Sequence, residues 1–164
     1  MSLFCAQPTI HVLIELATAL VTVFIESRRM IDLAATTTKV NPRTKPLVYV
    51  VDDEAMLLEL ATVILEPLGY EIVTFRDPDA ALANFARSKP RPALLITDYA
   101  MHSMNGMDLI QECRRLEPSQ KILLISGTVG PEIFGQAPCK PDRFLAKPYH
   151  ARQLIDLVRT MLTG

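Results

Sequence analysis

Five short runs rich in apolar residues recur from residue 47 onwards, at residues 47–51, 70–75, 93–97, 121–125 and 144–146. Runs of this kind predict strands that are buried on both faces, as the strands of a parallel sheet are. Between and after these runs, apolar residues recur at helical spacing over residues 57–68, 81–86, 107–116 and 154–161. This alternation predicts an α/β fold with a (βα)5 pattern. Right-handed crossovers would place helices on both faces of a doubly wound parallel sheet, giving three layers.

The segment between the fourth and fifth apolar runs differs from the other connections. Residues 129–141 contain three prolines, which remove backbone donors and interrupt helices. We therefore expect at most one or two helical turns there, around residues 132–136. The other connections carry ordinary boundary signals, such as Asp77 before Pro78 at a helix start and Pro118 after a helix end.

Charge and cysteine content exclude several classes of protein. The chain of 164 residues has 17 basic and 18 acidic side chains and a net charge of −1, so nothing in its charge favours a nucleic-acid partner. Its three cysteines, Cys5, Cys113 and Cys139, are odd in number and far apart. They fit neither a disulfide framework nor a zinc site, and they indicate a reducing compartment such as the cytoplasm.

Residues 1–46 are predicted to form an extension before a main domain at residues 47–164. Its apolar run is broken at four polar positions that fall on one stripe of a helix, namely His11, Glu15, Thr18 and Thr22. We expect an amphipathic helix over residues 9–29, followed by a linker rich in threonine and proline. The run is shorter than the roughly 20 residues that a membrane span needs, and Glu15 lies near its middle.

Three interpretations of this extension stay open. The helix could pack on its own domain or on a second copy, which would make a homodimer. It could instead lie on a membrane surface. The segment could also be absent from the natural product, with Met30 as an alternative start.

Polar side chains follow the predicted strands at the points where four of them end. Asp52 and Asp53 follow the first run, Asp98 the third, Ser126 the fourth and Lys147 the fifth. The carboxyl ends of parallel strands lie at one edge of a sheet, so these side chains are expected to meet there. Three crowded carboxylates repel one another, and a divalent cation relieves that repulsion. A few hard oxygen ligands with room for water and phosphate favour Mg²⁺.

A lysine and a hydroxyl at the same edge add donors for a tetrahedral anion. The arrangement suits the transfer of a phosphoryl group onto a carboxylate oxygen, with the metal and the lysine neutralising its charge.

Four groups of residues together resemble the receiver domains of two-component response regulators, over about residues 46–163. The resemblance implies a flavodoxin-like (CheY-like) fold with strand order 2-1-3-4-5. The matching residues are Val50-Val51-Asp52-Asp53-Glu54, Asp98-Tyr99-Ala100-Met101 with Met104 and Gly106, Ser126-Gly127, and Phe144-Leu145-Ala146-Lys147-Pro148.

The resemblance also implies a role for each matching residue. Asp98 would be the phosphoacceptor and a metal ligand, and Asp53 would bind Mg²⁺ directly. Asp52 would hold the metal through water, and the backbone carbonyl of Ala100 would complete the protein ligands. Lys147 would pair with the phosphoryl group.

Three further features concern the switch and the departures from the family pattern. Ser126 would move to bind the phosphoryl group while Phe144 turns inward, and the Lys147–Pro148 bond is expected to be cis. His102 stands where the family usually has proline, which predicts a looser loop. Phe144 lacks the hydroxyl that a tyrosine would offer a partner.

The function implied is that of a stand-alone response regulator and not of an enzyme. Asp98 would receive a phosphoryl group from a sensor histidine kinase or a histidine phosphotransfer protein in the bacterial cytoplasm. The phosphorylated domain would then bind an unknown downstream protein. A phosphorelay intermediate or a phosphate sink is the alternative.

Two other functions are alternatives. An aspartate-nucleophile phosphatase would also form an acyl phosphate, but its usual second acid would fall at Ala100. A degenerate receiver would bind partners without phosphate, although all five site positions carry the expected residue types.

Overall fold

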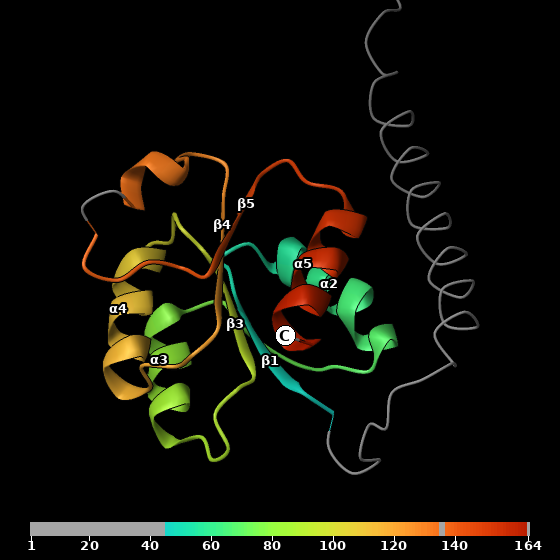
Figure 1. Cartoon of the computed structure of the whole chain (residues 1–164), viewed down its shortest axis with the longest axis horizontal. Coiled ribbons are helices and arrows are strands. Elements are labelled where there is room, and N and C mark those ends of the chain that lie inside the picture. The colour runs from blue at the N-terminus through green and yellow to red at the C-terminus, as the bar shows by residue number, and fades with distance from the viewer. Residues whose placement is uncertain (1–44, 135–136, 164) are drawn as a thin grey trace, which may run out of the picture. The chain divides into compact units, whose positions relative to one another are not determined.

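The computed structural model describes residues 45–134 and 137–163, which form one five-stranded parallel sheet covered by helices (Figure 1). The strand order is β2-β1-β3-β4-β5, so the predicted order and fold class are confirmed. The predicted helix at residues 9–29, and any dimer through it, lie outside the described residues. The strands are β1 (Leu47–Val51), β2 (Glu71–Phe75), β3 (Leu94–Asp98), β4 (Ile122–Ser126) and β5 (Arg143–Ala146).

Within residues 45–134 and 137–163, four α-helices connect or follow the strands, and they cover the two faces of the sheet in pairs (Figure 1). One face packs against α2 and α5, and the other against α3 and α4. None of the helices in residues 45–134 and 137–163 has the length and apolar character that a membrane crossing requires. The helices are α2 (Ala55–Leu65), α3 (Pro78–Arg87), α4 (Gly106–Leu116) and α5 (Ala151–Thr163), and two 3₁₀ helices span Glu66–Leu68 and Pro131–Phe134.

Alternate residues of the central strands supply the two halves of the core. In β1, Val48 and Val50 pack with α2 and α5, whereas Tyr49 and Val51 pack with α3 and α4. This alternation follows from the pleat of a strand, which points successive side chains to opposite faces. The strands β3 and β4 are buried along their whole length. Continuous apolar runs were therefore the correct signal for strands covered on both sides.

The connection from β4 to β5 is irregular, as its prolines predict. Its regular structure within the described residues is the 3₁₀ helix Pro131–Phe134. Phe134 packs edge-on against Phe144 of β5, with 5.6 Å between the ring centroids. This contact covers part of β5.

Candidate functional site

Three of the predicted side chains meet at the carboxyl edge of the sheet and form an acid–lysine cluster, defined here as Asp52, Asp98 and Lys147. The Nζ atom of Lys147 lies 2.6 Å from Oδ1 of Asp98 and 3.0 Å from Oδ2 of Asp52. Asp98 is the last residue of β3, and Asp52 and Lys147 directly follow β1 and β5. The sheet topology therefore brings together residues that are up to 95 positions apart in sequence.

The backbone around Lys147 aims its side chain at the acids. The Lys147 amide donates a hydrogen bond of 2.7 Å to the carbonyl of Ser126, which continues the pairing between β4 and β5. The Lys147–Pro148 peptide bond is cis. A Cβ atom at Gly127 would lie 3.3 Å from Cβ of Lys147, so the absence of a side chain there lets the two loops approach closely.

Burial and charge act in opposite directions within the cluster. Burial raises the pKa of Asp52, although the Glu54 amide and the Lys147 ammonium both favour its ionised form. Burial also works against the charged form of Lys147, but hydrogen bonds and charge interactions with Asp98 and Asp52 outweigh it and raise the pKa of the lysine. Lys147 thus stays protonated at neutral pH and places its positive charge beside both acids.

Asp98 is held from two sides. Its side chain is only 7% exposed, and its second oxygen, Oδ2, accepts a hydrogen bond of 2.6 Å from the Ala100 amide. Gly106, the first residue of α4, packs directly against the backbone of Asp98. A Cβ atom at position 106 would lie 2.2 Å from the Asp98 carbonyl oxygen, so the position has no room for a side chain. The Gly106 amide donates to the carbonyl of Tyr99. This packing fixes the loop between β3 and α4 against the end of β3.

Asp53 has different neighbours from the acid–lysine cluster. Its carboxylate oxygen Oδ2 contacts Nδ1 of His102, and its backbone carbonyl accepts hydrogen bonds of 3.3 and 3.2 Å from Arg76. From the sequence, His102 was predicted only as a departure in the loop, and its contact with Asp53 was not predicted. Its position four residues after Asp98, at the sheet edge that also carries Asp53, was the available signal.

The donor set fits Mg²⁺ chemically, because Asp52, Asp53 and Asp98 all supply hard oxygens at one edge of the sheet. Within the described residues, however, no three acidic, histidine or cysteine side chains gather closely enough to form a metal cluster. Lys147 contacts Asp52 and Asp98, and His102 contacts Asp53. Any metal would therefore need backbone and water oxygens to complete its coordination.

Ser126 and Phe144 lie outside the acid–lysine cluster. The buried Ser126 hydroxyl oxygen accepts hydrogen bonds from the amides of Thr128 (3.1 Å) and Val129 (3.2 Å), and not from Lys147. Phe144 is partly buried against Phe134. The structure thus brings Asp52, Asp98 and Lys147 into contact and leaves Ser126 and Phe144 in separate local contacts.

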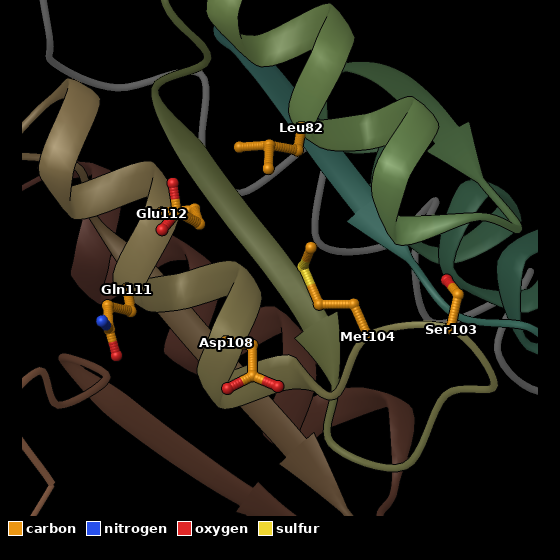
Figure 2. Close-up of a pocket in the computed structure, with 6 residues that line it drawn as sticks. All are labelled: Leu82, Ser103, Met104, Asp108, Gln111 and Glu112. Atoms are coloured by element: carbon orange, nitrogen blue, oxygen red, sulfur yellow. The ribbon is translucent and has the colours of Figure 1, made fainter.

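A pocket between α3 and α4 contains none of the predicted site residues (Figure 2). In Figure 2, Leu82 projects from α3, Ser103 and Met104 come from the loop before α4, and acidic and amide side chains come from α4. The charged side chains among the residues that line it are acidic. Its lining residues are Leu82, Ser103, Met104, Asp108, Gln111 and Glu112.

The fold and the cluster together define a flavodoxin-like α/β domain with buried acids and a lysine at the carboxyl edge of its sheet. The family model of the response regulator receiver domain matches residues 48–159, which is more than half of the chain. The chain therefore belongs to the response regulator receiver family, as its motifs predicted. Receiver domains are generally signalling domains of two-component systems.

The curated relatives differ in how much of their length the chain covers. The chain is 26% identical over 117 residues to the response regulator receiver protein CpdR of Brucella abortus, covering 70% of this chain and 95% of CpdR. It is 29% identical over 117 residues to the probable transcriptional regulatory protein TcrX of Mycobacterium tuberculosis, covering 70% of this chain but 49% of TcrX. The chain thus spans about half the length of some relatives and nearly all of another.

Solved structures show the same fold. The receiver domain protein (CheY-like) from Methanospirillum hungatei aligns with a TM-score of 0.67 and 24% identity, covering 73% of this chain and 95% of that one. The response regulator TrrA from Thermotoga maritima, solved in complex with Mg²⁺ and BeF, aligns with a TM-score of 0.64 and 27% identity. That alignment covers 73% of this chain and all of TrrA.

Proposed function

We propose that Asp98 accepts a phosphoryl group from a histidine of a sensor kinase or of a histidine phosphotransfer protein. The observation that carries this proposal is the position of Lys147, whose ammonium contacts both Asp98 and Asp52. A lysine at that position can follow the negative charge as it moves from the carboxylate to the phosphoryl oxygens. Membership of the receiver family supports the same reaction.

In this reaction a carboxylate oxygen of Asp98 attacks phosphorus. The new O–P bond forms as the N–P bond of the phosphohistidine breaks, and the histidine nitrogen leaves with the bonding electron pair. Lys147 pairs with a phosphoryl oxygen, and the Ala100 amide keeps a hydrogen bond to the acyl group. Burial of Asp98 limits the approach of water, which would compete as an acceptor.

The proposed metal is Mg²⁺, held by Asp53, Asp98 and the backbone carbonyl of Ala100, with Asp52 bound through water. When bound, the ion would supply positive charge to the phosphoryl oxygens and align them for attack. The acidic edge of the sheet supports this assignment, and so does the Mg²⁺ in the TrrA complex.

The proposed switch couples the new phosphoryl group to Ser126 and Phe144. To reach the phosphoryl group, the Ser126 hydroxyl must release the Thr128 and Val129 amides. Each such hydrogen bond contributes about 0.5–1.5 kcal/mol net, so a charge-assisted bond to phosphate can replace them. Movement of Phe144 would then break its contact with Phe134 and change the surface near β5.

The proposed output is binding of a protein partner by the phosphorylated domain, in the cytoplasm of a bacterium. The match covers 95% of CpdR, so a relative of this chain consists of little more than the receiver domain. A phosphorelay intermediate or a phosphate sink is the second candidate. MtrA, of which the chain covers 50%, is described as DNA-binding, whereas the net charge of −1 favours no such partner here. Residues 1–46 remain a proposed extension to the domain at 47–164.

An enzymatic role as a phosphatase is the least supported candidate. Position 100 carries alanine, whose side chain cannot act as the second acid, and the pocket in Figure 2 lacks the predicted site residues.

Incubation of the full chain with acetyl phosphate and Mg²⁺ tests the proposal. Intact-protein mass spectrometry is expected to show one added phosphoryl group on the wild type and none on Asp98→Asn. The matched control is Asp108→Asn, which removes an exposed acid on α4 and should leave the adduct in place. An unmodified wild type, or an adduct that survives Asp98→Asn, would contradict the proposal.

A further inference from the structure

His102 lies in the loop between β3 and α4, at the entrance to the acidic edge of the sheet. Its side chain is 92% exposed, yet its Nδ1 atom contacts the Oδ2 atom of Asp53, whose side chain is 22% exposed. Asp53 is the carboxylate proposed above as the direct Mg²⁺ ligand. An imidazole nitrogen is therefore already placed beside that metal ligand.

The position of His102 is supported by the backbone on both sides. Before it, the Ala100 amide is bonded to the Asp98 carboxylate. After it, the Ser103 hydroxyl lies 3.4 Å from a carboxylate oxygen of Asp77, which caps α3. The loop then enters α4 through Asn105, whose side chain accepts hydrogen bonds from the first amides of that helix. These contacts anchor the loop on both sides of His102.

The geometry of this pair is close to that of two ligands on one metal ion. Ligand atoms about 2.1 Å from a metal and at right angles to each other lie about 3 Å apart. Because Nδ1 of His102 and Oδ2 of Asp53 are already in direct contact, a small outward movement of His102 would let both atoms bind one metal ion. A neutral imidazole suits Ni²⁺, Co²⁺ and Zn²⁺, whereas Mg²⁺ prefers oxygen ligands throughout.

We propose that His102 is a metal-selecting residue that binds an imidazole-preferring divalent ion together with Asp53. When such an ion is bound, His102 supplies a nitrogen ligand, whereas the proposed Mg²⁺ site has oxygen ligands alone. Occupancy by Mg²⁺ requires the His102–Asp53 contact to open, so the same residue weakens Mg²⁺ binding. The inference rests on the proposed function only in placing a divalent ion at Asp53.

Calorimetric titration of the full chain with Ni²⁺ and, separately, with Mg²⁺ tests this selectivity. Loss of an outer-shell partner of a metal site already costs about 10–100-fold in affinity, so His102→Ala should weaken Ni²⁺ binding at least about tenfold. The exposed His102–Asp53 contact is weak, so its loss should strengthen Mg²⁺ binding by no more than about fivefold. His150→Ala is the matched control, because His150 is also exposed, and it should leave both affinities unchanged.

Proton NMR adds a readout that is independent of affinity. Ni²⁺ is paramagnetic, so substoichiometric Ni²⁺ should broaden the ring signals of His102 before those of His150. Equal Ni²⁺ affinity of the wild type and His102→Ala, or earlier broadening of His150, would overturn the inference while leaving Mg²⁺ binding and phosphorylation intact. A wild-type protein that neither binds Mg²⁺ nor forms the acetyl phosphate adduct would instead reject the proposed function.

Discussion

Replacement of Lys147 by methionine tests the acid–lysine cluster as a structural unit. Methionine keeps an unbranched side chain of similar length but removes the ammonium that contacts Asp52 and Asp98. Removing one partner of a fully buried ion pair costs about 3–5 kcal/mol, because the remaining charge is left uncompensated. Lys147 is 23% exposed, so water can partly solvate the two acids. We therefore expect the free energy of unfolding to fall by about 2 kcal/mol at pH 7.

The loss of stability should depend on pH in a defined direction. Burial already raises the pKa of Asp52, and loss of the ammonium that opposes this effect raises it further. A carboxyl group whose pKa is higher in the folded state binds protons more tightly there than in the unfolded chain. Acidification from pH 7 to pH 5 should therefore reduce the difference between the Lys147→Met variant and the wild type.

Urea denaturation at both pH values is the appropriate assay, with a second variant as control. Lys140→Met removes an exposed lysine and should change the free energy of unfolding by less than about 0.5 kcal/mol. The double variant Lys147→Met/Asp52→Asn should be more stable than the sum of the single changes predicts, because it removes one of the two repelling charges. A Lys147→Met protein as stable as the wild type at pH 7, or with the same deficit at pH 5, would refute this reasoning.

Three further predictions concern the loop and the metal. Gly106→Ala should lower the free energy of unfolding by about 2–3 kcal/mol in urea, because its Cβ atom would overlap the Asp98 carbonyl oxygen; wild-type stability would contradict the packing described. Asn105→Ala should cost about 1 kcal/mol in the same assay through loss of the α4 cap, and a neutral effect would show that the cap is not used. Mg²⁺ at 100 times its Kd should stabilise the wild type by about 2.7 kcal/mol in thermal unfolding, and Asp53→Asn should remove most of this shift. An equal shift in that variant would place the ion elsewhere.

The fold could be predicted from the sequence because its signals are local and agree with one another. Continuous apolar runs mark strands covered on both faces, and helical spacing marks the segments between them. The strand order came from the family resemblance, since periodicity alone does not order a sheet. Several strand ends differ by a residue from the predicted ones: β3 extends to Asp98 because the backbone pairing of Asp98 with Ile125 continues past the apolar residues.

The candidate site was predictable in part for the same reason. The contact of Lys147 with Asp98 follows from the rule that strand ends meet at one edge of a parallel sheet. The contact of His102 with Asp53 does not, because it depends on the path of an irregular loop. The hydrogen bonds of Ser126 within its own turn likewise depend on local backbone geometry that residue spacing does not specify.

Chemical mapping of the phosphorylated residue tests the central claim most directly. Borohydride reduces an acyl phosphate to an alcohol, so a phosphorylated aspartate becomes homoserine and can be located by peptide mass spectrometry. After treatment of the full chain with acetyl phosphate and Mg²⁺, we predict homoserine at position 98. Homoserine at position 52 or 53, or at no position, would contradict the account.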